Sequence, residues 1–161
     1  MLARTRKSMK DKDQGFTLIE LLVVMIIIGI LAAIAIPVFL SQRAKAQDSA
    51  VKADASTLGK EITSYFVDNT VAPAVTASNG PTGRYAVAGV DAGKQSNLVW
   101  LDTSLLAVAP PAAAPAALTT TGWTSTTWCF ALYNASGSQK TYKYSAQNGL
   151  ETGQCSTLTT P

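Results

Sequence analysis

Hydrophobic positions divide the chain into segments with different periodicity. Residues 16–40 are almost entirely apolar, and no charged residue occurs from Leu21 to Leu40. About 20 apolar residues in a helix that rises 1.5 Å per residue span roughly 30 Å, the thickness of the hydrocarbon core of a bilayer. We therefore expect a transmembrane helix over residues 16–40.

A second helical pattern follows directly over residues 41–69, and here the apolar positions recur at spacings of three and four. They are Val51, Ala55, Leu58, Ile62 and Phe66. Polar residues are expected to fill the other sides of the helix, with a favourable pair between Asp48 and Lys52. These polar residues include Lys45, Asp48, Lys52, Lys60 and Glu61. The pattern predicts one continuous helix from about Phe16 to about Val67, slightly weakened at Gly59 and open to a kink at Pro37.

The remaining residues, 70–161, predict a loop followed by a small sheet. Small and turn-forming residues over 70–97 indicate a loop, with a short strand near 85–88, and the Pro/Ala-rich residues 107–118 indicate an extended surface loop. Residues 97–101 predict a short strand or a helical turn. Further strands are expected over 123–134, over 139–146 and in a last segment containing Cys155, with turns at 135–138 and 147–149. The apolar stripe at 51–66 would cover this sheet, so the expected fold class is α+β.

Composition favours one membrane segment joined to one domain. Of the 161 residues, 47% are hydrophobic and 14% are charged, which argues against a disordered chain and against a multi-span membrane protein. The net charge of +3 is confined to residues 1–15, which carry five basic and two acidic side chains, and the rest is neutral. A basic segment before an apolar run is a topology signal that keeps the N-terminus cytoplasmic, and it does not indicate a nucleic-acid-binding domain.

The titratable residues exclude most catalytic sites. The chain has no histidine, which removes histidine bases, nucleophile pairs that use histidine and histidine metal ligands. The acids Asp91, Asp102 and Glu151 are too scattered for a calcium site. We therefore expect no enzyme, no metal and no cofactor. Two cysteines, Cys129 and Cys155, indicate one disulfide in an oxidising compartment, or alternatively two buried thiols.

The most informative motif joins the basic leader to the apolar helix. It runs Gly15-Phe16-Thr17-Leu18-Ile19-Glu20. This string resembles the prepilin cleavage signature of type IV pilins, closely over residues 10–45 and loosely elsewhere. The resemblance implies a pilin fold, removal of residues 1–15 by a prepilin peptidase after Gly15, and N-methylation of Phe16. It also implies that Glu20, with Thr17 beside it, sets subunit register by neutralising the N-terminus of an adjacent copy.

The resemblance further implies where the chain is located and how it assembles. The mature chain would sit in the cytoplasmic membrane with its C-terminal domain outside, until an assembly ATPase and a platform protein move it into a helical homopolymer. That extracellular fibre would serve adhesion, motility or DNA uptake. Gly29 and Pro37 match positions where pilin helices are interrupted in the fibre. Cys129 and Cys155 match the pair that staples the C-terminal region of many pilins.

A physical argument supports the role of Glu20 independently. A carboxylate inside a bilayer costs about 2.5–3.5 kcal/mol and usually has a partner. Cleavage after Gly15 would release an α-amine on Phe16, one helical turn away. Alternatively, Glu20 flanks an ordinary signal anchor in the headgroup region, or Ala33-Ile34-Ala35 ends a secretory signal peptide. The mass of the mature chain separates these cases.

Three further alternatives concern the head of the protein. The chain could be a type II secretion pseudopilin, or a membrane-anchored binding domain that never polymerises. The aromatic residues near Lys140 and Lys143 are expected in the core, although such a set can also bind single-stranded nucleic acid. They are Trp123, Trp128, Tyr133, Tyr142 and Tyr144. Asn134-Ala135-Ser136 is an N-glycosylation sequon of the kind that arises by chance.

Overall fold

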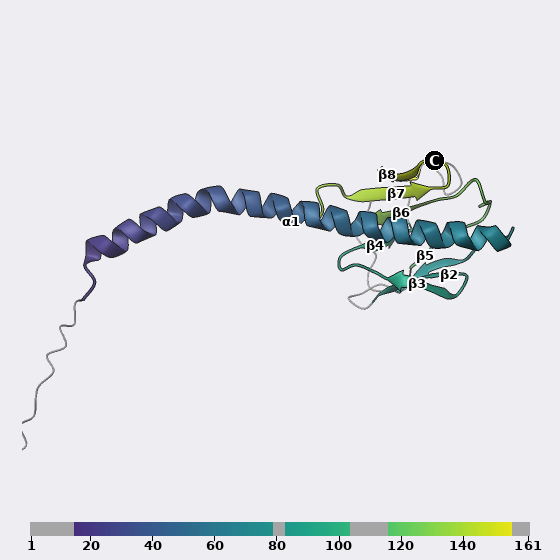
Figure 1. Cartoon of the computed structure of the whole chain (residues 1–161), viewed down its shortest axis with the longest axis horizontal. Helices are drawn as coiled ribbons and strands as arrows, with labels where there is room; N and C mark the ends of the chain where they lie inside the picture. The colour runs from purple at the N-terminus through teal and green to yellow at the C-terminus, as the bar shows by residue number, and fades with distance from the viewer. Residues whose placement is uncertain (1–14, 79–82, 104–115, 156–161) are drawn as a thin grey trace, which may run out of the picture. The chain divides into compact units, whose positions relative to one another are not determined.

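A computed structural model describes residues 15–78, 83–103 and 116–155 (Figure 1). The chain divides between Phe39 and Leu40 into an N-terminal part and a C-terminal part, which are described separately below. Most of the basic leader and most of the Pro/Ala-rich segment 107–118 lie outside the described residues.

One helix, α1, runs from Leu18 to Asp68 without interruption, as the apolar periodicity predicts. All five residues of the predicted stripe are buried: Val51, Ala55, Leu58, Ile62 and Phe66. Their spacing places them on the face of the helix that meets the head of the protein, and they join one hydrophobic core with residues of the strands. The α+β fold class, a long N-terminal helix with small antiparallel sheets, is confirmed.

The C-terminal residues form an antiparallel sheet as expected, here called sheet B, but its last strand ends at Thr152 and does not include Cys155 as predicted. Its strand order is β4-β6-β7-β8. The strands are β4 (Trp100–Asp102), β6 (Cys129–Tyr133), β7 (Thr141–Ser145) and β8 (Gly149–Thr152). The strand predicted over 123–134 begins only at Cys129, because Thr124 and Thr127 exchange backbone hydrogen bonds of 3.1 and 3.3 Å and close a tight turn.

A second antiparallel sheet, sheet A, corrects the prediction of a loop over 70–97. Its strand order is β3-β2-β1-β5. The strands are β1 (Val75–Ala77), β2 (Arg84–Val87), β3 (Val90–Lys94) and β5 (Ala116–Ala117). Ala88 and Gly89 both have positive φ and connect Val87 to Val90 in a two-residue hairpin turn of the kind that fits strand twist. The prediction of a surface loop over 107–118 is wrong at its C-terminal end, because Ala116 and Leu118 are buried.

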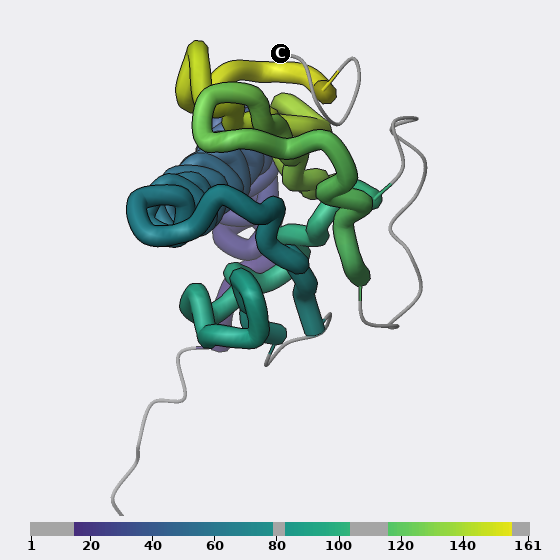
Figure 2. Tube along the Cα trace, turned by 90° about the vertical axis from the view of Figure 1, so that its right-hand side faces the viewer, coloured from purple at the N-terminus to yellow at the C-terminus, as the bar shows by residue number. Residues whose placement is uncertain are grey.

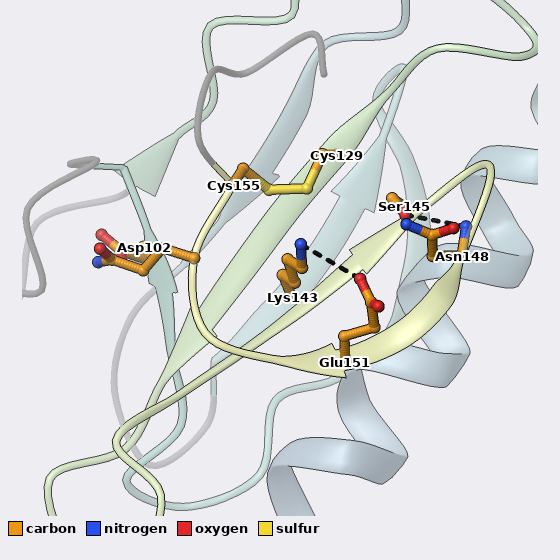
Figure 3. Close-up of a disulfide and its surroundings, with 8 residues drawn as sticks. Asp102, Cys129, Lys143, Ser145, Asn148, Glu151 and Cys155 are labelled. Atoms are coloured by element: carbon orange, nitrogen blue, oxygen red, sulfur yellow. Dashed lines mark hydrogen bonds and ion pairs between the residues drawn. A yellow bond between two sulfur atoms is a disulfide. The ribbon is translucent and has the colours of Figure 1, made fainter. Parts of the chain in front are cut away.

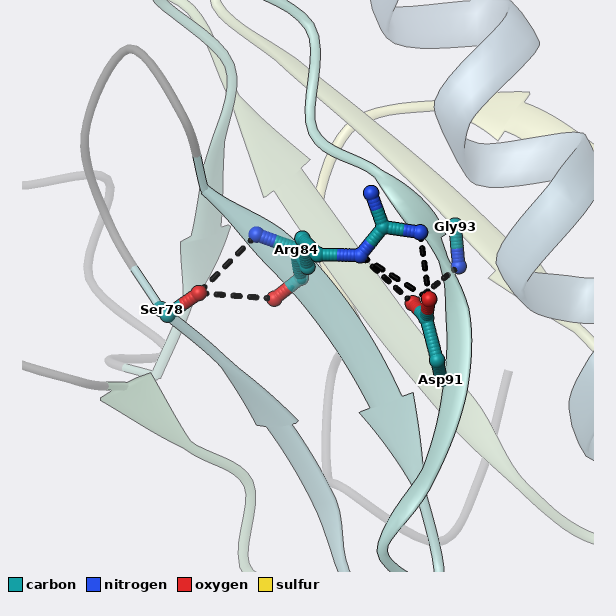
Figure 4. A network of polar contacts seen from close by, with 4 residues as sticks. All are labelled: Ser78, Arg84, Asp91 and Gly93. Atoms are coloured by element: carbon teal, nitrogen blue, oxygen red, sulfur yellow. Dashed lines mark hydrogen bonds and ion pairs between the residues drawn. The ribbon is translucent and has the colours of Figure 1, made fainter.

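The outer strand of sheet A carries a polar network at its edge (Figure 4). The Arg84 guanidinium donates to Asp91, with Nε 2.9 Å from Oδ2, and Asp91 Oδ1 also accepts the backbone N–H of Gly93 at 3.0 Å. The hydrogen bond from Arg84 lowers the pKa of Asp91 below its ordinary value. Because Asp91 binds an edge N–H and the strand pairing shifts at Tyr85/Ala86, this edge is poorly suited to pairing with another strand.

The C-terminal half of α1 lies between the two sheets (Figures 1 and 2). Two buried aspartates tie it to them. Asp48 accepts hydrogen bonds from the Ser138 hydroxyl and from Gln139 N–H, at 3.2 Å, in the turn that precedes β7. The prediction that Asp48 lies on the solvent side of the helix is therefore wrong. A charged residue at this position is tolerated because polar donors of the turn surround it.

The second aspartate, Asp54, anchors the helix to sheet A. Its Oδ2 accepts the Tyr85 hydroxyl at 3.1 Å and Ser96 N–H at 2.7 Å, and its Oδ1 accepts the Ser96 hydroxyl at 2.7 Å. Burial, followed by the negative charge of Asp54, raises the pKa of Tyr85 far above its ordinary value. Tyr85 therefore stays protonated and remains a donor to Asp54 throughout the physiological range.

Close packing joins the opposite side of the helix to sheet B. A Cβ on Gly59 would lie 2.6 Å from Cε1 of Tyr144, so glycine lets the ring approach the helix backbone. Lys52 Nζ lies 5.3 Å from the centre of the Tyr142 ring, a cation–π distance, and does not form the predicted pair with Asp48. Of the five aromatic residues expected in the core, Trp123, Trp128 and Tyr142 are buried and Tyr144 is half-buried against the core, whereas Tyr133 is half-buried and outside the core cluster.

Candidate functional site

The start of α1 is built by three hydrogen bonds between Thr17 and Glu20. Glu20 Oε2 accepts the Thr17 backbone N–H at 2.8 Å and the Thr17 hydroxyl at 2.6 Å, and the Glu20 backbone N–H donates to Thr17 Oγ1 at 3.3 Å. This is the reciprocal arrangement of a capping box, with a threonine at the N-cap and a glutamate three residues later. Thr17 and Glu20 together therefore fix where the helix begins.

Because the helix begins at Leu18, the peptide bond between Gly15 and Phe16 lies outside it. Gly15 is exposed and nothing lies within 4 Å of the position a Cβ would take there. The Phe16 side chain is 82% exposed. The bond that the sequence singles out for cleavage is thus in irregular, accessible chain.

The capping box also shows how Glu20 is satisfied in an uncleaved chain. Its carboxylate uses one oxygen, Oε2, for both donors of Thr17. The expected partner of Glu20, the α-amine of Phe16, exists only after cleavage. The pairing of Glu20 with this amine therefore stays a prediction. The motif Thr-x-x-Glu at 17–20 was available in the sequence as a capping signal.

The N-terminal part of α1 exposes its apolar side chains on all sides. From Phe16 to Leu40 the large hydrophobic residues are between 46% and 82% exposed. Of the helices within the described residues, α1 is long and apolar enough to cross a membrane, and its most apolar window has a mean hydropathy of 3.1. Such a surface is stable only in lipid or against other apolar surfaces.

Gly29 and Pro37, the two residues predicted to interrupt the helix in a fibre, both lie within continuous α1. Proline removes one backbone donor and glycine has low helix propensity, so these are the weakest positions by composition in the apolar part of the helix, residues 18–40. Nothing lies within 4 Å of the Cβ position at Gly29, so no packing contact in this chain requires a glycine there. Their role in a fibre stays a prediction.

The predicted disulfide is formed in the head of the protein (Figure 3). Cys129 begins the central strand β6, and Cys155 follows β8, with a sequence separation of 26. Both cysteines are buried. The Lys143–Glu151 ion pair, 3.2 Å, joins β7 to β8 close by. The disulfide therefore fixes the end of the described chain to the middle of sheet B.

Two weaker predictions concern surface chemistry of the head. Asn134 of the sequon is fully buried, donates to Gln47 Oε1 at 2.9 Å and accepts Ser136 N–H at 2.8 Å, so a folded head cannot carry a glycan there. Trp128, Phe130 and Tyr144 stack on one another at centroid distances of 5.9 to 6.1 Å. Since Trp128 and Phe130 are buried, their faces serve the core and do not form a platform for bases.

Sequence comparisons match the segment around Gly15 and Glu20 to a known N-terminal motif. Residues 10–36 match the family described as "Prokaryotic N-terminal methylation motif". The chain is 47% identical over 55 residues to the type IV major pilin protein PilA of Myxococcus xanthus, covering 34% of this chain and 25% of that protein. It is 35% identical over 81 residues to the type IV major pilin protein PilE of Neisseria gonorrhoeae, covering 50% and 48%.

The chain is also similar to a protein of another system. It is 37% identical over 59 residues to the type II secretion system core protein G of Escherichia coli, covering 37% of this chain and 41% of that protein. The chain thus spans between a quarter and about half of the length of these curated relatives. No solved structure matches it.

Proposed function

We propose that this chain, which carries the N-terminal methylation motif and resembles type IV major pilins at its N-terminus, is the precursor of a structural subunit of a type IV pilus. One observation carries the proposal. A capping box of Thr17 and Glu20 opens a helix whose apolar side chains are exposed on every side, directly after an accessible Gly15–Phe16 bond.

The proposed processing follows from that geometry. A prepilin peptidase removes residues 1–15 after Gly15, and the new N-terminus on Phe16 is methylated. Cleavage places a positive amine next to the only carboxylate of the apolar segment, Glu20. Opposite charges in a medium of low dielectric attract strongly, so an unpaired amine on one copy and Glu20 on another favour one axial register. Thr17 holds the Glu20 side chain close to that terminus.

The proposed assembly exchanges lipid for protein around the same helix. Before assembly the N-terminal half of α1 lies in the cytoplasmic membrane with the head outside. An assembly ATPase and a platform protein then transfer the subunit into a helical homopolymer, where the apolar side chains contact neighbouring copies. Apolar burial is similar in both environments, so the transfer can be driven in either direction. Gly29 and Pro37 give the helix places at which it can loosen when packed.

The similarity to core protein G supports one alternative, a pseudopilin of type II secretion. The two functions differ in the product. A pilin gives long fibres that can be sheared from the cell surface, whereas a pseudopilin functions within the envelope. A membrane-anchored domain that does not polymerise gives neither.

The experiment is electron microscopy of sheared surface material with antibody labelling of this chain. We expect labelled fibres from the wild type and few from Glu20→Ala, while leader removal continues in both. Glu151→Ala, a carboxylate of sheet B, is the matched control and should leave fibres abundant. Absence of fibres from the wild type, or equal fibre yield from Glu20→Ala, would refute the proposal.

A further inference from the structure

The exposed flanks of α1 in the head carry opposite charges at matched spacings. Lys45 and Lys52 are seven positions apart, and so are Glu61 and Asp68. All four side chains are exposed. Residues seven apart lie on the same side of a helix, about two turns and roughly 10 Å from each other. The helix thus presents a basic ridge, Lys45 and Lys52, and an acidic ridge, Glu61 and Asp68.

The two ridges lie on opposite sides of the helix. Lys45 and Glu61 are sixteen positions apart, which is about 4.4 turns, and the same holds for Lys52 and Asp68. The contacts agree with this count. Lys52 lies over Tyr142 of sheet B, whereas Glu61 and Asp68 line a notch with Val87 and Val90 of sheet A. The buried stripe runs between the ridges and is covered by the head.

The notch beside the acidic ridge suits a lysine side chain. It is lined by Glu61, Ser64, Tyr65, Asp68, Val87 and Val90. Val90 is 70% exposed at the tip of the β2–β3 hairpin and gives the notch an apolar rim. A lysine can lay its methylene chain on such a rim and keep its ammonium group near carboxylates. Within residues 15–78, 83–103 and 116–155, Glu61 and Asp68 have no ion-pair partner.

We propose that the basic ridge of one copy of this chain docks on the acidic ridge of another copy, with Lys45 against Glu61 and Lys52 against Asp68. In a helical fibre this is a different neighbour from the copy whose Phe16 amine meets Glu20, because that pairing offsets two copies by only about four residues. Because both ridges have the same spacing, the two pairs form together at one axial offset of sixteen residues, about 24 Å between parallel helices. An offset of nine or of twenty-three residues forms a single pair. This inference rests on the proposed function, since it requires copies of the chain side by side in a fibre.

The geometry of this contact produces an open polymer. The contact joins two different surfaces of the same molecule, on opposite flanks of the helix, so each copy offers one free ridge of each sign. Such a head-to-tail contact with an axial offset generates a helical filament and does not close into a dimer. Since each pair is exposed, its contribution is small and screened by salt, and the repeated pairs select register more than they supply affinity.

Charge reversal tests the pairing. Glu61→Lys should lower the yield of sheared fibres by roughly tenfold, and adding Lys45→Glu should restore it to within about twofold of wild type. Lys94→Glu, an exposed cation of β3 outside both ridges, is the control and should leave the yield unchanged. Each variant must retain its Cys129–Cys155 disulfide and its amount in the membrane, which shows that the head is folded.

The variant that combines Glu61→Lys with Lys45→Glu separates a failure of the pairing from a failure of the proposed function. If Glu61→Lys assembles normally, or if Lys45→Glu fails to restore it, the proposed pairing is wrong even though fibres exist. If the wild type forms no fibres, the proposed function itself fails. The two failures are therefore distinguishable.

Cross-linking tests the offset. In fibres of Lys45→Cys combined with Glu61→Cys, a short bismaleimide cross-linker should give a ladder of covalent oligomers; a direct disulfide requires a closer approach of the two backbones than a lysine–glutamate pair does. Lys45→Cys combined with Lys94→Cys, which keeps the pair of Lys52 and Asp68 and places the second cysteine outside the acidic ridge, should give none. A ladder from the second pair, or no ladder from the first, would overturn the proposed register.

Discussion

Replacing Gly59 with alanine sets two effects of opposite sign against each other. In the interior of a helix, alanine is favoured over glycine by about 0.8–1.0 kcal/mol. Helix propensity alone therefore predicts a more stable protein. In this fold, however, the new Cβ would lie 2.6 Å from Cε1 and 2.7 Å from Cδ1 of Tyr144, well inside the ordinary contact distance of about 3.5–4.0 Å.

The Tyr144 ring has limited room to withdraw from that contact. It stacks on Trp128 and Phe130 with centroid distances of 5.9 and 6.1 Å, and its strand β7 lies between β6 and β8. Overpacking of this kind costs about 1–3 kcal/mol. Subtracting the gain in propensity leaves an expected loss of about 1 kcal/mol in the free energy of unfolding.

The assay is urea unfolding of the full chain in detergent, followed by tryptophan fluorescence. Trp128 stacks on Tyr144 and should report the unfolding of this region. Ser49→Ala, at an exposed position of the same helix, is the control and should be neutral or slightly stabilising. In a Tyr144→Leu background, Gly59→Ala should become stabilising, because the clash is gone. If Gly59→Ala stabilises the otherwise unchanged protein, the account of this contact is refuted.

Three further predictions concern the head. Cys129→Ser should lower the free energy of unfolding by about 3.5 kcal/mol, as measured by urea unfolding, and should reduce fibre yield; normal piliation would remove the proposed role of the disulfide. Asp54→Ala should lower the free energy of unfolding by at least about 2 kcal/mol, because it leaves the hydrogen-bond donors of Tyr85 and Ser96 unpaired. Asp54→Asn should lower it by less, and equal losses from the two variants would argue against a stabilising role of these hydrogen bonds. Because the pKa of Tyr85 is raised in the folded protein, the stabilisation from its protonated hydroxyl is complete below pH 10, about the pKa of tyrosine in the unfolded chain. Above that pH the free energy of unfolding should fall by about 1.4 kcal/mol per pH unit. Tyr85→Phe should remove this part of the pH dependence, as measured by urea unfolding at several pH values.

The helix and its buried stripe could be predicted from the sequence because their signals are periodic. Apolar residues at spacings of three and four mark the face that is buried from Val51 to Phe66. The strands of sheet B were found largely because β-branched and aromatic residues mark them. These signals are local, so no knowledge of the partner elements was needed.

Of sheet A only β2 was predicted, as the short strand near 85–88, and the sheet as a whole was missed because its other strands give weak signals. The strands β1 (Val75–Ala77) and β5 (Ala116–Ala117) are only three and two residues long, too short to show an alternating pattern, and they form because β1 pairs with both β2 and β5. The hairpin turn at Ala88–Gly89 uses alanine where asparagine is the usual signal. Tertiary pairing therefore decided the structure of this segment.

The buried charges were missed for a related reason. Asp48 and Asp54 are acidic residues on a helix, and acidic residues are rarely buried unless they have partners. Their partners, Ser138 and Gln139 for the first and Tyr85 and Ser96 for the second, are between 31 and 91 positions away in the chain. A single sequence does not reveal such contacts. The capping box at Thr17 and Glu20, by contrast, is a local motif that the sequence contained.

The most direct test of the account is the intact mass of the chain isolated from the cell envelope and from sheared fibres. We expect a chain that begins at Phe16, carries one methyl group on its N-terminus and retains one disulfide. A chain that still contains residues 1–15, or one that begins after Ala35, would contradict it.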